Sequence, residues 1–404
     1  MSSALTNPVR STPRPTHVGR IWSDKPLRWL FGAIAALSLV ALLAGFIAPY
    51  DHRSQDRTAI KAPPTRLHFI DAEGRFHLRP FIYRSRLVDR TTWRYEEDTR
   101  WRYPLVFFVR GDRVELFPGV TTSLHLFGVG EAEPLTSAQR EIHPLQMPTG
   151  SRGESPLATP EHPPLPPRLY LLGADHLGRD VFSRLLFGCR PSLIIALASG
   201  LGALIIGLVL GCLAGYYGGV VDALLMRLNE LIESIPVIFF IFALRSALPL
   251  ELSPDTALGM LVVIFVAISW TTVARITRGA VLSLAGQEFL LAARAVGASE
   301  GRILRCYILP HALTPALTQA TLTVPAFLLA EATLSFLGVG ISEPEPSWGN
   351  MLAAARDLSV LTAQPWMLSS GLALAATVAL FIVTGHALRR ALDPQRQTSA
   401  PEWL

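Results

Sequence analysis

The stretch QEFLLAARAVGASEGRILRCYILP, residues 287–310, lies between two long apolar segments and has the pattern of two short helices joined by a turn. Glu288 falls in the first turn of the first helix, where a carboxylate suits the positive end of the helix dipole. Gly297 stands where a left-handed helix stop is expected, because only glycine adopts that conformation at little cost. Ser299 is the expected N-cap of the second helix, and Pro310 is expected to end it.

The first of these helices combines apolar and small residues. Phe289, Leu290, Ala293 and Val296 recur at helical spacing, which predicts one apolar face. The small side chains of Ala292 and Ala293 would let another protein surface approach the backbone closely. The sequence therefore predicts a helix–glycine turn–helix elbow that contacts a partner. An amphipathic loop without a partner is the alternative.

These residues resemble the EAA motif of ABC importer permeases, which reads Glu-Ala-Ala, a Gly four residues after the second Ala, and Ile-x-Leu-Pro. Here the sequence reads Leu291-Ala292-Ala293, then Gly297, then Ile308-Leu309-Pro310. Leu291 replaces the motif's Glu, with an effect left open, whereas Glu288 matches an acidic position of the peptide-importer branch. In that family the elbow docks onto a separate ATPase. The resemblance therefore implies an ATPase-coupling role for Glu288, Leu291, Ala292, Ala293, Gly297, Ser299 and Pro310.

The composition indicates a membrane protein. Half of the 404 residues are hydrophobic and only 17% are charged, which is below the charged share of soluble domains. The net charge of +5 is not a nucleic-acid signal, because many basic residues lie in one insert or beside apolar runs. The three cysteines are far apart and fit neither a disulfide framework nor a zinc site.

The order of apolar and polar segments predicts an all-α polytopic membrane protein with six transmembrane helices, both termini cytoplasmic and a β-rich extracytoplasmic insert between helices 1 and 2. A secretory signal peptide is the competing interpretation of the first apolar run, but FIAPYDH is a poor cleavage site. The expected spans are 30–48, 192–216, 222–248, 256–275, 311–340 and 365–388. The expected divisions are a cytoplasmic tail at 1–28, transmembrane helix 1 at 29–49, the insert with a Pro-rich linker at 50–172, an interfacial amphipathic segment at 173–190, the permease domain at 191–390 and a cytoplasmic tail at 391–404.

The insert shows strand patterns. Residues 67–70 and 75–78 read as one hairpin, and residues 105–109 and 114–117 read as another, with a turn at Gly111. Between them Trp93 and Trp101 belong to an aromatic run that alternates with Arg and Glu. Such a run can bind single-stranded nucleic acid, but a strand with a charged outer face is the interpretation we favour. Prolines are dense over 144–167, which predicts an extended linker.

Further segments carry the resemblance to a narrower group. GADHLGRDVFSRLLFGCRPSL, residues 173–193, is similar to the segment before the second helix in C-type permeases of dipeptide and oligopeptide importers. LSFLG at 334–338 and PSWGN at 346–350 also resemble that branch. Asp175, His176 and Asp180 could suggest a metal site, but caps and hydrogen-bond partners are the favoured interpretation. The resemblance implies the type I ABC importer permease fold in the bacterial inner membrane.

Carboxylates inside apolar runs are candidates for a translocation path or a partner interface. Arg227, Glu230 and Glu233 lie at i, i+3 and i+6, and an interior position and an interfacial helix start explain them equally well. Glu331 is isolated in an apolar run. We expect it in the bundle interior or at the partner interface, and not against lipid.

No ATP site is encoded, because the only two lysines, Lys25 and Lys61, lie outside any P-loop pattern. The sequence predicts no catalytic, cofactor or metal site and no nucleic-acid partner. The resemblance implies ATP on partner subunits, namely two ABC ATPase subunits or domains, together with a homologous second permease and an extracytoplasmic solute-binding protein, all at a lipid bilayer. An ion-gradient-driven secondary transporter and a membrane-anchored binding protein are the alternatives. The solute stays open among peptides, modified peptides and nickel complexes.

Overall fold

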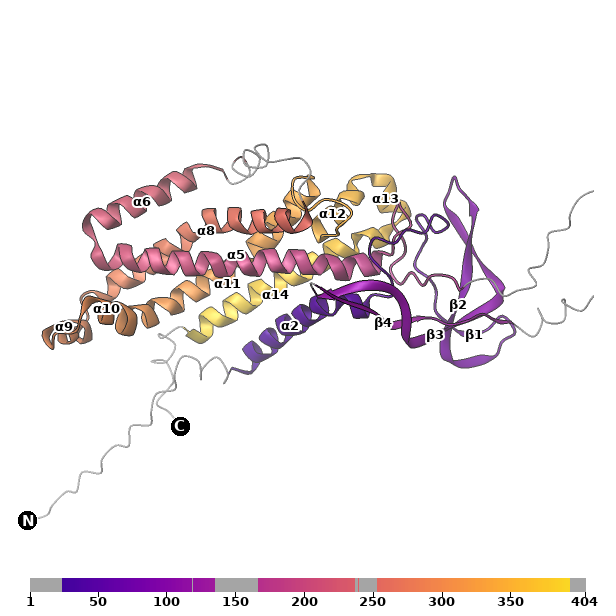
Figure 1. Ribbon diagram of the computed structural model, residues 1–404, viewed down its shortest axis with the longest axis horizontal. Helices are drawn as coiled ribbons and strands as arrows, with labels where there is room; N and C mark the ends of the chain where they lie inside the picture. The colour runs from indigo at the N-terminus through magenta and orange to yellow at the C-terminus, as the bar shows by residue number, and fades with distance from the viewer. Residues whose placement is uncertain (1–23, 118, 135–165, 237–238, 240–252, 393–404) are drawn as a thin grey trace, which may run out of the picture.

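A helical bundle carries a β-sheet at one end and the elbow at the other (Figure 1). The computed structural model describes residues 24–117, 119–134, 166–236, 239 and 253–392. The long helices are α2 (Lys25–Leu42), α5 (Val181–Tyr217), α6 (Gly219–Ser234), α8 (Pro254–Leu284), α11 (Leu309–Phe336) and α14 (Ser369–Leu392). The short helical segments are α3 (Ala44–Ile47), α9 (Glu288–Ala295), α10 (Glu300–Ile303), η1 (Leu304–Ile308), α12 (Trp348–Ala353), η2 (Ala354–Arg356), α13 (Leu358–Ala363) and η3 (Pro365–Leu368).

Five helical segments within the described residues are long and apolar enough to cross a membrane. They are Lys25–Leu42, Val181–Tyr217, Pro254–Leu284, Glu300–Phe336 and Pro365–Leu392. These correspond to five of the six predicted spans. The remaining one, 222–248, begins in α6, but most of its apolar half lies outside the described residues, so a sixth span stays a prediction.

Helix α5 differs from the expected division at residue 190. Asp180 caps its start by accepting a hydrogen bond of 2.8 Å from the backbone N–H of Ser183, and the helix then runs through Pro191 without a break. The guanidinium of Arg190 donates to the carbonyl of Ala41 at 2.7 Å, which ties this part of α5 to α2. The chain thus has no break at residue 190, and an interfacial position of the part before it stays a prediction.

Glycines let α5 and α8 pack closely along their lengths. A Cβ placed on Gly211 would lie 2.5 Å from the carbonyl oxygen of Ala274, closer than any real side chain approaches. Other glycines of α5 meet α8 in the same way: Gly202, Gly207 and Gly215. Because the helix backbones approach so closely, these positions accept no larger residue without a shift of one helix.

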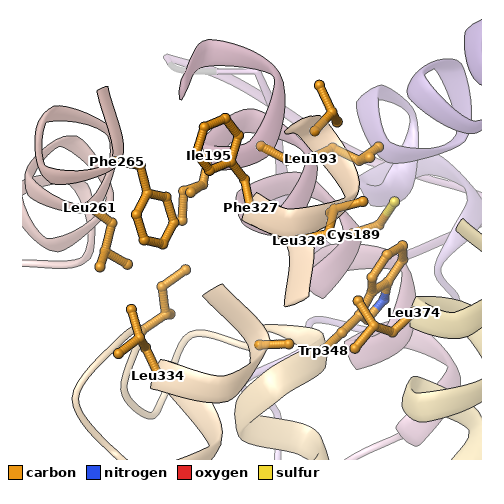
Figure 2. Close-up of a cluster of buried hydrophobic side chains, with 14 of the residues drawn as sticks. Cys189, Leu193, Ile195, Leu261, Phe265, Phe327, Leu328, Leu334, Trp348 and Leu374 are labelled. Atoms are coloured by element: carbon orange, nitrogen blue, oxygen red, sulfur yellow. The ribbon is translucent and has the colours of Figure 1, made fainter. Parts of the chain in front are cut away.

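A buried apolar cluster holds α5, α8, α11, α12 and α14 together at the end nearer the sheet (Figure 2). The rings of Phe265 and Phe327 stack with centroids 5.5 Å apart, joining α8 to α11. Trp348 of α12 is buried and donates its indole N–H to the carbonyl of Leu185 at 3.1 Å. The polar end of the largest side chain is thus satisfied inside an apolar setting.

The insert contains an antiparallel sheet of five strands, in the order β1-β2-β3-β4 with β5 also on β3. The strands are β1 (His68–Ile70), β2 (Phe76–Asp89), β3 (Arg94–Phe117), β4 (Val120–Val129) and β5 (Glu133–Pro134). The first predicted hairpin is confirmed as β1 and β2. The predicted linker at 144–167 lies almost entirely outside the described residues.

The second predicted hairpin is wrong. Strand β3 is 24 residues long and passes through Gly111 without turning back. The pairing register with β4 shifts between Arg110 and Val114. Gly111 and Asp112 therefore form an irregularity within a continuous strand and not a turn. Gly111 is needed there because a Cβ would lie 3.0 Å from the ring of His125. The chain instead reverses before β4, next to Gly119, whose φ is +82°.

Candidate functional site

The elbow begins where α8 ends and is built on a glycine stop. Helix α9 ends at Ala295 with Val296 as its C-cap, and Gly297 follows with φ of +84°. Gly297 donates its N–H to the carbonyl of Arg294 at 2.9 Å, and Ala298 donates to the carbonyl of Ala293 at 3.1 Å. These two bonds form a Schellman motif, which closes the helix and reverses the chain. The predicted left-handed role of Gly297 is confirmed.

The second half of the elbow differs from the expectation. Ser299 occupies the N-cap position of α10, but its side chain makes no capping hydrogen bond, and only its carbonyl accepts from Ile303 at 3.0 Å. Pro310 does not end the helix, because the chain continues from Glu300 to Phe336. Pro310 has no N–H to donate to the helix. Just before it the chain makes a wider turn, η1, in which Leu309 donates its N–H to the carbonyl of Leu304 five residues back.

Three apolar anchors fix the elbow to the bundle. Leu290, Ile303 and Ile308 are buried in a cluster with residues of α5 and α8. The predicted single apolar stripe is wrong in one respect, because Leu290 points inward while Val296 is 89% exposed. Leu291, in the place of the motif's Glu, is 53% exposed. The elbow is thus packed against α5 and α8 on one side and exposes apolar side chains on the other.

Of the remaining predicted coupling residues, Glu288 and Ala292 are exposed and Ala293 is half-buried. Side contacts join the elbow to the end of α5. Tyr216 donates its hydroxyl to the carboxylate of Glu300, and the guanidinium of Arg294 lies 5.6 Å from the centroid of the Tyr216 ring. The end of α5 therefore contacts both halves of the elbow.

Glu331 lies in the bundle interior. Its carboxylate is fully buried and accepts a hydrogen bond of 2.8 Å from Ser192 of α5 and another of 2.8 Å from Ser335 of α11. Each carboxylate oxygen thus has a donor, as a buried carboxyl group requires. The interior placement is the predicted one, whereas a part in a translocation path stays a prediction.

The two carboxylates of α6 lie on the surface of the chain. Glu230 pairs with Arg227 on the same helix at 2.9 Å, and Glu233 pairs with Arg275 of α8. A third acidic residue, Asp222, accepts two hydrogen bonds from Arg278 of α8, one of them 2.6 Å long. The pairs made by Glu233 and Asp222 join α6 to α8.

A cluster of charges at the sheet end of the bundle had no sequence signal. Arg179 and Arg184 are buried, and both donate to Glu343, which lies in the loop after α11. In the same loop Glu345 accepts from His52 at 3.2 Å and from Arg53. The partners are far apart in sequence, so no local pattern could have predicted them.

The hydrogen bonds of Glu345 lower the pKa of its carboxyl group. Burial acts to raise its pKa, but the donors His52 and Arg53 outweigh burial and lower the pKa to about 2. The carboxylate is therefore ionised at neutral pH, and the loop after α11 stays attached to the segment that follows α3.

The acidic segment before α5 is structural. Asp175 accepts from the backbone N–H of Leu177 at 2.8 Å and from the guanidinium of Arg179 at 2.7 Å, and Asp180 caps α5. The favoured interpretation of these residues as caps and hydrogen-bond partners is confirmed. Within the described part of the chain, no group of three or more His, Cys, Asp or Glu side chains could hold a metal ion.

Comparison with protein families gives a match to the part of the bundle from the end of α5 onwards. The family described as "Binding-protein-dependent transport system inner membrane component" matches residues 207–398. The elbow and Glu331 lie inside the matched range, whereas the insert lies outside it.

Comparison with curated proteins gives peptide transport permeases among the relatives of this chain. The chain is 37% identical over 232 residues to the oligopeptide transport system permease protein OppC of Bacillus subtilis, covering 57% of this chain and 73% of that protein. It is 36% identical over 233 residues to the dipeptide transport system permease protein DppC of Bacillus subtilis, covering 57% and 71%. It is 36% identical over 232 residues to the di/tripeptide transport system permease protein DppC of Pseudomonas aeruginosa, covering 57% and 74%.

Among solved structures, the chain is similar to an inward-facing form of the MetNI methionine ABC transporter. The identity is 21%, the match covers 52% of this chain and 96% of that chain, and the TM-score is 0.40.

Proposed function

The chain belongs to the family of binding-protein-dependent transport system inner membrane components, and on that basis we propose that it is the permease subunit of an ATP-driven importer of peptides. The named relatives are permeases of oligopeptide, dipeptide and di/tripeptide systems, which favours peptides over nickel complexes as the solute. As a permease subunit the chain is not itself an enzyme, and ATP would bind to partner chains. The two alternatives, an ion-gradient transporter and a membrane-anchored binding protein, have no comparable support.

The observation that carries the coupling role is the geometry of the elbow. The elbow lies at the end of the bundle opposite the sheet, anchored by buried side chains and presenting Leu291 and Val296 outward (Figure 1). Exposed apolar side chains on a rigid support are what a protein partner can cover. We assign this face to an ATPase subunit, with Glu288, Ala292, Ala293 and Gly297 in the same contact. Ser299 and Pro310 act by shaping the second half.

The assembly would need further chains. We assign α6, which carries Glu230 and Glu233, and the adjoining part of α8 to contact with a homologous second permease, because the apolar residues Leu224, Leu231 and Val263 are exposed there. Glu331, buried between α5 and α11, would hold the interior of this permease in shape beside the path. An extracytoplasmic solute-binding protein would deliver the solute at the sheet end.

The topology proposed for this assembly has the elbow and both termini in the cytoplasm and the sheet outside. The arginines near the elbow, Arg294, Arg302 and Arg305, support this orientation, since short cytoplasmic loops are rich in basic residues. The bacterial inner membrane would be the site.

The test is purification of the tagged chain from membranes of cells that co-express two ATPase subunits and a second permease, followed by reconstitution in lipid. Added di- and oligopeptides with the solute-binding protein should stimulate ATP hydrolysis. A matched preparation with Gly297→Val should lose the ATPase subunits. If the wild-type chain carries no ATPase through purification and no peptide stimulates hydrolysis, the proposal is wrong.

A further inference from the structure

The insert contains a basic cavity that the proposed function does not use. The cavity has a volume of about 680 Å³, which is within the range of small-molecule sites. It opens beside β2 and β3 and is lined by Trp93, Trp101 and five arginines: Arg57, Arg84, Arg86, Arg90 and Arg100. A single carboxylate, Asp98, lies among these lining residues.

Most of these arginines have no carboxylate partner. Asp98 is committed to Arg100, which donates to it at 2.9 and 2.6 Å, and these bonds lower the pKa of Asp98. Within the described ranges, no carboxylate lies within 4.0 Å of the guanidinium of any of the other four arginines that line the cavity. Like charges gathered around one cavity repel, so an anion placed among them would relieve this repulsion.

The backbone beside the cavity is held in an unusual conformation. Lys61 and Trp93 are non-glycine residues with φ of +58° and +52°, and the ammonium of Lys61 lies 5.0 Å from the centroid of the Trp93 ring. Left-handed backbone is unfavourable at such residues and gathers at functional sites. The N–H of Lys61 is fixed by the carbonyl of Asp175 at 2.9 Å, so this conformation is set by the surrounding chain.

An irregularity in the pairing of β2 with β3 lies beside the cavity and places side chains along it. Tyr83 pairs with Arg102, but the next residue of β2, Arg84, pairs with Asp98. Three residues of β3, from 99 to 101, are therefore extra and bulge out of the ladder. Trp101 belongs to this bulge and lines the cavity beside Arg84.

From these observations we propose that the insert cavity binds a small solute with at least two carboxylate or phosphate groups beside an aromatic or apolar part. Guanidinium groups recognise both anions by paired N–H donors, and Trp faces stack on flat or apolar groups. Arg84 and Arg86 hold the anionic groups, and Trp93 and Trp101 hold the apolar part. The cavity lies outside the matched family range, so this binding role does not rest on the peptide-import proposal.

The test measures binding to the full-length chain alone in detergent, without ATPase subunits. The probes are fluorescently labelled Glu-Trp-Glu, Glu-Ala-Glu and Gln-Trp-Gln peptides and a phosphotyrosine peptide. The acidic probes should bind and the neutral one should bind at least tenfold more weakly, a difference of about 1.4 kcal/mol. Binding of the acidic probes should weaken as salt rises. The carboxylate and phosphate arms show which anion the site prefers.

Two variants and one control locate the site. Arg84→Gln with Arg86→Gln should weaken the acidic probes about tenfold or more. Arg66→Gln with Arg79→Gln, on exposed arginines of the same insert outside the cavity lining, should change binding less than about twofold. Trp93→Gly keeps the left-handed backbone and removes the ring, so it should weaken Glu-Trp-Glu more than Glu-Ala-Glu.

Several outcomes would overturn the proposal. These are equal binding of the Glu and Gln peptides, equal losses in the cavity and control variants, or no binding of any acidic probe at about physiological salt. Binding only to vesicles that contain phosphatidylglycerol would assign the arginines to a lipid surface instead.

A thermal unfolding midpoint unchanged in Arg84→Gln/Arg86→Gln would show that a loss of binding is not a loss of folding.

Discussion

Ser192 of α5 donates a hydrogen bond of 2.8 Å to Glu331 of α11 in a site closed to solvent. Ser335 donates to the other carboxylate oxygen at 2.8 Å, and its own hydroxyl accepts from the N–H of Ile341 at 3.0 Å. One carboxyl group thus joins two long helices and, through Ser335, the loop that follows α11.

Removal of this carboxyl group should destabilise the bundle. Glu331→Ala leaves two buried hydroxyls without their acceptor and opens a cavity, so we expect a loss of about 2–4 kcal/mol in the free energy of unfolding. Glu331→Gln keeps the volume and one acceptor oxygen and should lose less. The thermal unfolding midpoint of the purified chain measures both, and equal midpoints for wild type and Glu331→Ala would contradict this role.

Substitution of Gly297 should separate coupling from folding. Among the described residues, apart from its chain neighbours, no atom lies within 4 Å of a Cβ built at this glycine, so only the left-handed backbone opposes a side chain. Gly297→Val should strain the turn by about 1–2 kcal/mol or swing α10 away. We expect normal accumulation in the membrane and loss of the ATPase subunits during purification, with loss of uptake.

The control for Gly297 lies four residues further on. Gly301 also has open space where a Cβ would lie, but its φ is not in the left-handed range. Gly301→Ala should therefore retain ATPase and uptake, while Gly297→Ala should show a milder form of the Gly297→Val defect. Full uptake by Gly297→Val with ATPase still bound would mean that the elbow is not the coupling element. Ala293→Glu, which places charge on the same surface, should behave like Gly297→Val.

The close approach of α5 and α8 predicts a second pair of glycine variants. Gly211→Ala places a Cβ against the backbone of Ala274, so one helix must shift at a cost of about 1–3 kcal/mol. Gly259→Ala, in α8 where a Cβ meets nothing within 4 Å, should be neutral or slightly stabilising. Unfolding midpoints of the purified variants compare the two, and a neutral Gly211→Ala would refute the tight packing.

Cysteine labelling tests the orientation of the chain. Cys306 is exposed near the elbow, whereas Cys189 and Cys212 are buried. A membrane-impermeant maleimide added to intact spheroplasts should leave Cys306 unlabelled until the membrane is permeabilised. In a Cys306→Ser background, Ser85→Cys on the insert should be labelled without permeabilisation. The reverse pattern would place the insert in the cytoplasm.

The ion pairs of Glu345 predict a dependence of stability on pH. Its pKa is lowered to about 2 in the folded chain from the ordinary value of 4.5, so folding favours the ionised form. The stabilisation is present above about pH 4.5 and is lost as the pH falls towards about 2, with an upper bound of about 3 kcal/mol that solvent screening reduces. The difference in unfolding midpoint between wild type and Glu345→Gln should be full at pH 6, smaller at pH 3 and nearly absent below about pH 2. A difference independent of pH would show that the carboxylate charge is not responsible.

Local features of the chain were predictable from the sequence where the cause is local. The stop at Gly297 depends on the conformational freedom of one residue, and the hairpin of β1 and β2 depends on a short turn. Burial of Glu331 was predictable because a lone carboxylate in an apolar run costs several kcal/mol against lipid.

Other features depended on distant partners and were not predictable. Gly111 and Asp112 look like a turn, yet the pairing of β3 with β4 keeps the strand continuous. Pro310 looks like a helix end, yet the helix continues past it through the wider turn η1. The flanking residue Ile308 is buried in the bundle, a distant contact that the local sequence does not reveal. The pairing of Arg179 with Glu343 spans 164 positions and has no local pattern at either end.

Helix α5 has 37 residues without a break, which corresponds to a rod of about 55 Å. Arg190 near one end binds the carbonyl of Leu116 in the insert, and Tyr216 at the other end binds the elbow. A rod fixed at both ends acts as a lever, so a tilt of about 5° about its middle would displace each end by about 2 Å. Such a displacement is enough to break a hydrogen bond, so a tilt of α5 would alter its contacts with the insert and with the elbow together.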